Sequence, residues 1–150
     1  MEQGVNSNEW HGNAKIFRTY LKGGGKDGKR SVEKHKGLGN IRTFGDAAQF
    51  PSFGAVLSDG WVDISFDDAE MSKTFLAIAK DQQWHCMVLE NKNNGHIHTY
   101  WKDTEHKIQK FRRDQRLACG LLADIHGGDT YIPLRCLGSD RFPPVFDISP

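Results

Sequence analysis

In the stretch "WVDISFDDAEMSKTFLAIAK", residues 61–80, the hydrophobic pattern changes its period part-way along. The alternation over 61–66 predicts a β-strand, and Asp59-Gly60 predicts a tight turn that joins it to an earlier strand over 53–58. From 67 to 83, apolar residues recur at spacings of three and four, which indicates an amphipathic helix. We therefore expect a sheet with this helix packed on one face.

Other segments of the chain mix strands and helices without strict alternation. We expect further strands over 14–22, 85–91, 96–102, 121–127 and 130–138, and helices over 43–50 and 105–120. The second and third of these strands should form a hairpin through residues 92–95. This order predicts an α+β sandwich with a largely antiparallel sheet. Residues 1–13 are expected to be a flexible lead-in, and 14–150 a single domain.

The composition describes an ordinary soluble domain. The chain has 150 residues, of which 37% are hydrophobic and 26% charged, and its net charge of +1 favours no particular partner. No apolar run reaches the roughly 18 residues of a membrane span, and the polar N-terminus does not resemble a secretory signal. The three cysteines show no CxxC spacing, which favours reduced thiols in a cytoplasm.

The segment "NNGHIHTYWK", residues 93–102, places two histidines on one face of an expected strand. Because strand side chains alternate, His96, His98 and Tyr100 should point one way, opposite to their neighbours. Such a pair suits a metal site, a phosphate-binding site or a solvated sheet face. The pattern by itself leaves all three open.

Acidic side chains on two other expected strands favour the first two chemistries. The polar residues that alternation puts on one face are Asp63, Ser65 and Asp67 in one strand and Asp124 and His126 in the other. If these strands neighbour the histidine strand, clustered carboxylates would need a cation, and hard oxygen ligands suit Mg²⁺ or Mn²⁺. A competing interpretation gives Asp67 the role of helix cap, in a capping box with Glu70.

A glycine-rich basic segment lies at 23–40, "GGGKDGKRSVEKHKGLGN". Its glycines predict a flexible loop, and its cations could follow a nucleic-acid backbone. The candidate phosphate-binding residues are Lys26, Lys29, Arg30, Lys34 and Lys36. A loop whose charges only aid solubility is the alternative.

The succession "GAVLSDGWVDISFDD", a helix, "NGHIHTYW", a helical segment and "LLADIHGGDTYIPL" resembles the catalytic core of the archaeo-eukaryotic primase (prim-pol) superfamily. It is most similar to primase-like N-terminal domains of replication proteins from phages and other mobile genetic elements. The resemblance covers roughly residues 14–148. It implies an RRM-like core and a nucleotidyltransferase that makes or extends DNA primers with two metal ions, Mg²⁺ or Mn²⁺.

The resemblance also implies roles for individual residues. Asp67 is the first-motif metal ligand, with Asp68 or Asp63 as its partner, and Asp124 is the third-motif ligand. His98 contacts the phosphates of the incoming nucleotide, and His96 and Ser65 are expected to bind the nucleotide beside it. The catalytic set is accordingly Asp63, Asp67 and Asp124. In this chain, Ser65 stands where the family pattern has its first aspartate.

Two alternatives remain at this stage. A prim-pol-like domain that has lost its chemistry could bind single-stranded DNA or a replication partner. A rolling-circle nickase also uses His-hydrophobe-His, but the segment expected to carry its tyrosine has Phe111 instead. The implied partners are single-stranded DNA, nucleoside triphosphates and a replicative helicase, with no membrane.

Overall fold

The computed structural model describes residues 17–25, 29–33, 43–47, 49–84, 86–91, 94–108 and 111–135, together with the backbone of 141–148. The expected lead-in, 1–13, lies outside these residues. The elements are β1 Tyr20–Gly24, β2 Arg30–Ser31, α2 Phe44–Ala47, β3 Phe53–Val56, β4 Trp61–Phe66, α3 Ala69–Asp81, β5 Cys86–Asn91, β6 Ile97–Lys102, β7 Arg112–Arg116, β8 Leu122–His126, β9 Tyr131–Arg135 and β10 Arg141–Ile148.

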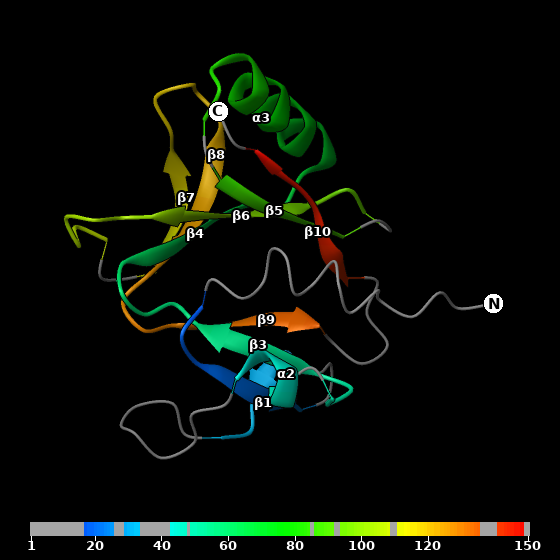
Figure 1. Ribbon diagram of the computed structural model, residues 1–150. Helices are drawn as coiled ribbons and strands as arrows, with labels where there is room; N and C mark the ends of the chain where they lie inside the picture. The colour runs from blue at the N-terminus through cyan, green and yellow to red at the C-terminus, as the bar shows by residue number, and fades with distance from the viewer. Residues whose placement is uncertain are drawn as a thin grey trace.

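The described strands form two sheets in which neighbouring strands are antiparallel. The smaller sheet has the order β2-β1-β3-β9, and the larger has the order β10-β5-β6-β4-β8-β7. In Figure 1, α3 lies against one side of the larger sheet and the smaller sheet lies on the other side, with α2 beside β1. The expected α+β architecture with mostly antiparallel sheets is therefore confirmed.

One hydrophobic core lies between α3 and the larger sheet. Phe75 on the helix stacks at a centroid distance of 4.6 Å on Phe66 of β4, and its neighbours include the buried Val88 and Ile97. On the same face, the Thr99 hydroxyl donates to the Ile64 carbonyl at 2.6 Å. The alternation over 61–66 thus buries one side of β4 under the helix, as the sequence predicted.

A second core joins the two sheets. It contains Tyr20 and Phe53 from the smaller sheet and Met87, Leu89 and Tyr100 from the larger one. The last three residues share a face with His98, because Leu89 is the cross-strand partner of His98 and Met87 that of Tyr100. One face of the larger sheet is therefore apolar where it meets the smaller sheet and polar beyond it.

The turn at Asp59-Gly60 is present, but it does not connect a hairpin. Both residues have positive φ, 56° and 81°, and the Trp61 N–H donates to the Ser58 carbonyl at 3.2 Å. The strands on either side enter different sheets, since β3 pairs with β1 and β9 while β4 pairs with β6 and β8. Burial of β3 on both faces explains this, because its four residues all lie in the core.

The helix expected over 105–120 is wrong. Residues 112–116 form β7, which pairs with β8. The segment offers too few apolar residues for a buried helical face, and helices in proteins owe most of their stability to such a face. As an edge strand of charged residues, it instead completes the hydrogen bonding of β8.

The first strand and the following loop also differ from expectation. Residues 17–19 are not part of a strand, β1 begins at Tyr20, and it continues to Gly24, which pairs with Arg30 of β2. Part of the expected 23–40 loop is therefore a short hairpin. The C-terminal strand β10 had no counterpart in the sequence prediction. No helix among the described residues is long and apolar enough to span a bilayer.

The close packing around Gly54 in the smaller sheet gives a stability prediction. A Cβ there would collide with the Ile132 carbonyl oxygen and the Tyr131 ring, whereas a Cβ at the exposed Gly45 meets only the Thr43 hydroxyl at 3.9 Å. We expect Gly54→Ala to lower the free energy of unfolding by about 1–3 kcal/mol or more. Gly45→Ala should leave it unchanged or raise it by up to about 1 kcal/mol. Urea titration of both variants checks this, and equal effects would contradict it.

Candidate functional site

The candidate site lies on the face of the larger sheet away from α3, and the central strand β4 organises it. Ser65 is the cross-strand partner of His98 on β6 and of Asp124 on β8. One strand step away, Asp63 is the partner of His126 on β8. Because directly opposed residues of an antiparallel pair point to the same side, these side chains share one face. The predicted convergence of three strands is thus present.

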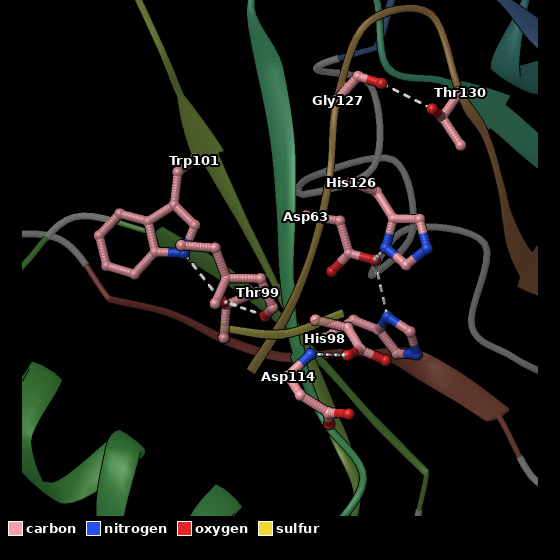
Figure 2. A network of polar contacts seen from close by, with 10 residues as sticks. Asp63, His98, Thr99, Trp101, Asp114, His126, Gly127 and Thr130 are labelled. Atoms are coloured by element: carbon pink, nitrogen blue, oxygen red, sulfur yellow. Dashed lines mark hydrogen bonds and ion pairs between the residues drawn. The ribbon is translucent and has the colours of Figure 1, made fainter. Parts of the chain in front are cut away.

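Asp63 is the most deeply buried member of the group. Its side chain is 1% exposed, and its Oδ2 lies 2.9 Å from Nδ1 of His98 and 3.7 Å from Nδ1 of His126. Figure 2 shows the carboxylate between the two imidazoles, with Trp101 and Thr99 on the opposite side of β4. Since a carboxylate accepts, the short contact holds the His98 proton on Nδ1. Asp63 Oδ1 is buried and has no hydrogen-bond partner among the described residues.

His126 is held by an aromatic neighbour. Its ring stacks on that of Phe111 with centroids 4.3 Å apart and an interplanar angle of 26°. Burial lowers the pKa of His126, and the negative charge of Asp63 opposes that shift. The neutral imidazole is therefore the favoured form in the folded protein.

Asp124 is fixed by the neighbouring edge strand. Its Oδ1 accepts a hydrogen bond of 2.9 Å from the backbone N–H of Asp114. Asp114 has a φ of 51°, and the β7–β8 register shifts between Arg112 and Gln115. This bulge turns the Asp114 N–H toward the site. Sequence reasoning missed Asp114, because the segment was expected to be helical.

The residues at the start of α3 have different tasks from those expected. The cap is Asp68, whose Oδ1 accepts from the Met71 N–H at 2.7 Å, and the capping box predicted for Asp67 and Glu70 is wrong. The helix begins at Ala69, which is one residue later than a cap at Asp67 would require. Asp67 is left 78% exposed, with its Oδ1 3.9 Å from Nδ1 of His96.

The carboxylate oxygens of this face are of the kind that a hard divalent cation prefers. The described residues contain no group of three His, Cys, Asp or Glu side chains arranged to hold a metal ion. Mg²⁺, however, usually takes only one or two carboxylates and completes its shell with water and substrate phosphates. Asp63 Oδ1, without a partner, and the carboxylate of Asp124 are oxygens of that kind.

The basic residues of the 23–40 segment are only partly described. Lys29 and Arg30 are exposed at the β1–β2 hairpin of the smaller sheet. Lys26, Lys34 and Lys36 lie outside the described residues. Their expected role in nucleic-acid binding stays a prediction.

Comparisons of the chain with known protein families, with curated proteins and with solved structures find no match.

The role of Asp68 gives a stability prediction. Asp68→Ala removes the acceptor for the Met71 N–H and should lower the free energy of unfolding by about 0.5–2 kcal/mol, whereas Asp68→Asn keeps a capping oxygen and should cost little. Thermal or urea unfolding measures both. If Asn were as damaging as Ala, the charge of Asp68 rather than its capping oxygen would matter.

His126 gives a pH prediction. Because its pKa is lower in the folded state, the unfolded chain binds the proton more readily as the pH falls through about 6.5. The contribution of His126 to stability is thus present above that pH and is lost below it. We expect the free energy of unfolding to fall less between about pH 7.5 and 5.5 in His126→Gln than in the wild type. His106→Gln, at an exposed position, controls for loss of an imidazole, and equal slopes in His126→Gln and the wild type would contradict the expectation.

Proposed function

We propose that the chain is a prim-pol-type nucleotidyltransferase domain that acts in DNA replication of a phage or other mobile genetic element. The observation that carries the proposal is the row His98, Ser65 and Asp124 across three neighbouring strands. These residues come from the three segments on which the resemblance rests. Their common face supports binding of one ligand by all three.

The strand order supports an RRM-like core as the finer description of the fold. Strand β4, helix α3 and the hairpin β5–β6 are followed by β8, and these strands lie side by side as β5-β6-β4-β8. A ferredoxin-like unit, to which RRM domains belong, has a strand, a helix, a hairpin, a second helix and a last strand. Here β7 stands where that second helix is expected.

The proposed reaction extends a strand by one nucleotide. The 3′-hydroxyl releases its proton to water as its oxygen forms a bond to the α-phosphorus, the bond from that phosphorus to the β-phosphate oxygen breaks, and pyrophosphate leaves. His98, oriented through its Nδ1 by Asp63, would donate from Nε2 to phosphate oxygens, with His96 and Ser65 as further nucleotide contacts. Asp63, Asp67 and Asp124 would hold Mg²⁺ or Mn²⁺, which stabilises the attacking and leaving oxygens.

A second candidate follows from Ser65. It occupies the central place in the row, between His98 and Asp124, and a hydroxyl brings no negative charge there. A domain with one carboxylate fewer than the family pattern could have kept nucleotide or single-stranded DNA binding without polymerisation. A rolling-circle nickase is less well supported, because Tyr20 and Tyr100 lie in the core and the hydroxyl of Tyr131 on β9 is buried, so that none of the three tyrosines is accessible as a nucleophile.

The proposed setting is a cytoplasm, where nucleoside triphosphates and single-stranded DNA are the substrates. A replicative helicase is the proposed protein partner, because a primase acts on strands that a helicase exposes. Both statements depend on the proposed activity.

Primer synthesis tests the proposal directly. The protein is mixed with single-stranded DNA, labelled ribo- or deoxynucleotides and Mg²⁺ or Mn²⁺, and labelled oligonucleotides are resolved on a gel. Asp124→Asn can still accept from the Asp114 N–H but loses the charge, so we expect synthesis to fall by about 100-fold or more, near 2.7 kcal/mol. Asp81→Asn at the exposed end of α3 is the matched control.

Ser65→Asp separates the two candidates. If the wild type synthesises primers and Asp124→Asn does not, the domain is an enzyme as it stands. If the wild type binds a nucleotide but incorporates none, the second candidate is favoured, and Ser65→Asp should increase Mn²⁺ binding measured by calorimetry. Synthesis that survives Asp63→Asn, Asp67→Asn and Asp124→Asn alike would contradict the assignment of this face.

A further inference from the structure

The edge strand β7 presents two different faces. Arg112 is the cross-strand partner of Ile125, and Arg116 is that of Leu122. Leu122 and Asp124 alternate with Ile125, so Arg116 shares the face of the candidate site, whereas Arg112 points to the side of α3. The same alternation puts the residues on either side of Arg112 on the face of the site.

Phe111, directly before β7, lies at the rim of the candidate site. Its ring stacks on His126, as described above, yet its side chain remains 45% exposed. The guanidinium carbon of Arg113 lies 5.8 Å from the centroid of the same ring. An aromatic ring and a guanidinium plane therefore stand together at the rim of the candidate site, open to solvent.

The charge of this rim is strongly positive for so short a segment. Residues 111–116 contain three arginines and one aspartate, although the whole chain has a net charge of only +1. All three arginines are exposed, and Arg116 is steadied by a hydrogen bond of 3.1 Å from its Nη1 to the Gly120 carbonyl. An anionic partner is the electrostatic complement of such a strand.

We propose that Phe111, Arg113 and Arg116 form a contact site for single-stranded DNA beside the nucleotide-binding face. One base stacks on the Phe111–Arg113 pair, since both aromatic rings and guanidinium planes receive bases, and Arg116 binds a backbone phosphate. Arg113 and Arg116 lie on either side of the bulge at Asp114, so both side chains can share the face of the site. The contact is tolerant of sequence, because every base has a π face.

The choice of a DNA strand as occupant rests on the proposed function, but DNA binding at this site can be measured whether or not the protein is a polymerase. The combination of one stacking position with two cations along a strand fits a chain of phosphates. A single nucleotide bound at His98 would not need Arg116 at the far end of β7. The site therefore deepens the proposed function by naming where the template strand lies.

The test measures binding of a fluorescein-labelled oligo(dT) by anisotropy at several salt concentrations. We expect Phe111→Ala and Phe111→Leu to weaken binding roughly 5- to 100-fold with an unchanged salt slope, and Phe111→Tyr to bind like the wild type. Arg113→Gln and Arg116→Gln should each reduce the slope of log K against log salt by about 0.7. Arg112→Gln, with the same charge change on the opposite face, is the matched control and should alter the slope much less.

Three outcomes distinguish this contact site from the alternatives. Equal effects of Arg112→Gln and Arg113→Gln would overturn the proposal, because binding would then depend on charge alone. The proposal would also be overturned if Phe111→Ala or Phe111→Leu weakened binding of a nucleoside triphosphate but not of oligo(dT). A wild-type protein that makes no primer but keeps the expected differences in DNA affinity would support this contact site while removing the proposed polymerase activity.

Discussion

The antiparallel pairing of β4 on both of its edges is the constraint on which the rest of the site depends. A residue of β4 that faces away from α3 has one cross-strand partner on β6 and one on β8. Ser65 thereby brings His98 and Asp124 into one row, although they are 26 residues apart in the sequence. A slip of one residue in either pairing would turn one partner into the core under α3. The hydrophobic residues that fix this register, Ile64 and Phe66, therefore also fix the chemistry.

The burial of Asp63 is a second constraint on the site. An ionised carboxylate that is 1% exposed is costly unless it is paired, and His98 at 2.9 Å provides the partner. Such a pair contributes little net stability, but it orients the His98 imidazole. His126 lies farther from Asp63 and stacks on Phe111, and burial lowers its pKa. Two histidines beside one carboxylate thus have different electrostatic surroundings.

The sequence predicted those parts of the fold whose pattern is local. The alternation over 61–66 and the helical period that follows it gave β4 and α3, and the phase of the polar residues gave the common face. Edge strand β7 was not predictable in this way, because its charged residues carry no period and its conformation is set by pairing with β8. The burial of Asp63 was also not predictable, because alternation assigns a side chain to one face of the sheet but does not say what covers that face.

The two oxygens of Asp63 resolve an apparent conflict between its roles. A carboxylate that orients His98 is not free to act as a cation ligand through the same atom, and Ser65 supplies no charge to replace it. Oδ2, however, makes the contact with His98, while Oδ1 has no hydrogen-bond partner among the described residues. In the proposed site, Oδ2 would hold the imidazole and the buried Oδ1 would be the oxygen left for a cation, as ligating carboxylates commonly make a second contact. Under the proposed function, Asp63 would take the place of the aspartate that the resembled family has at the position of Ser65, one strand step or about 7 Å away along β4, and would connect the cation to His98.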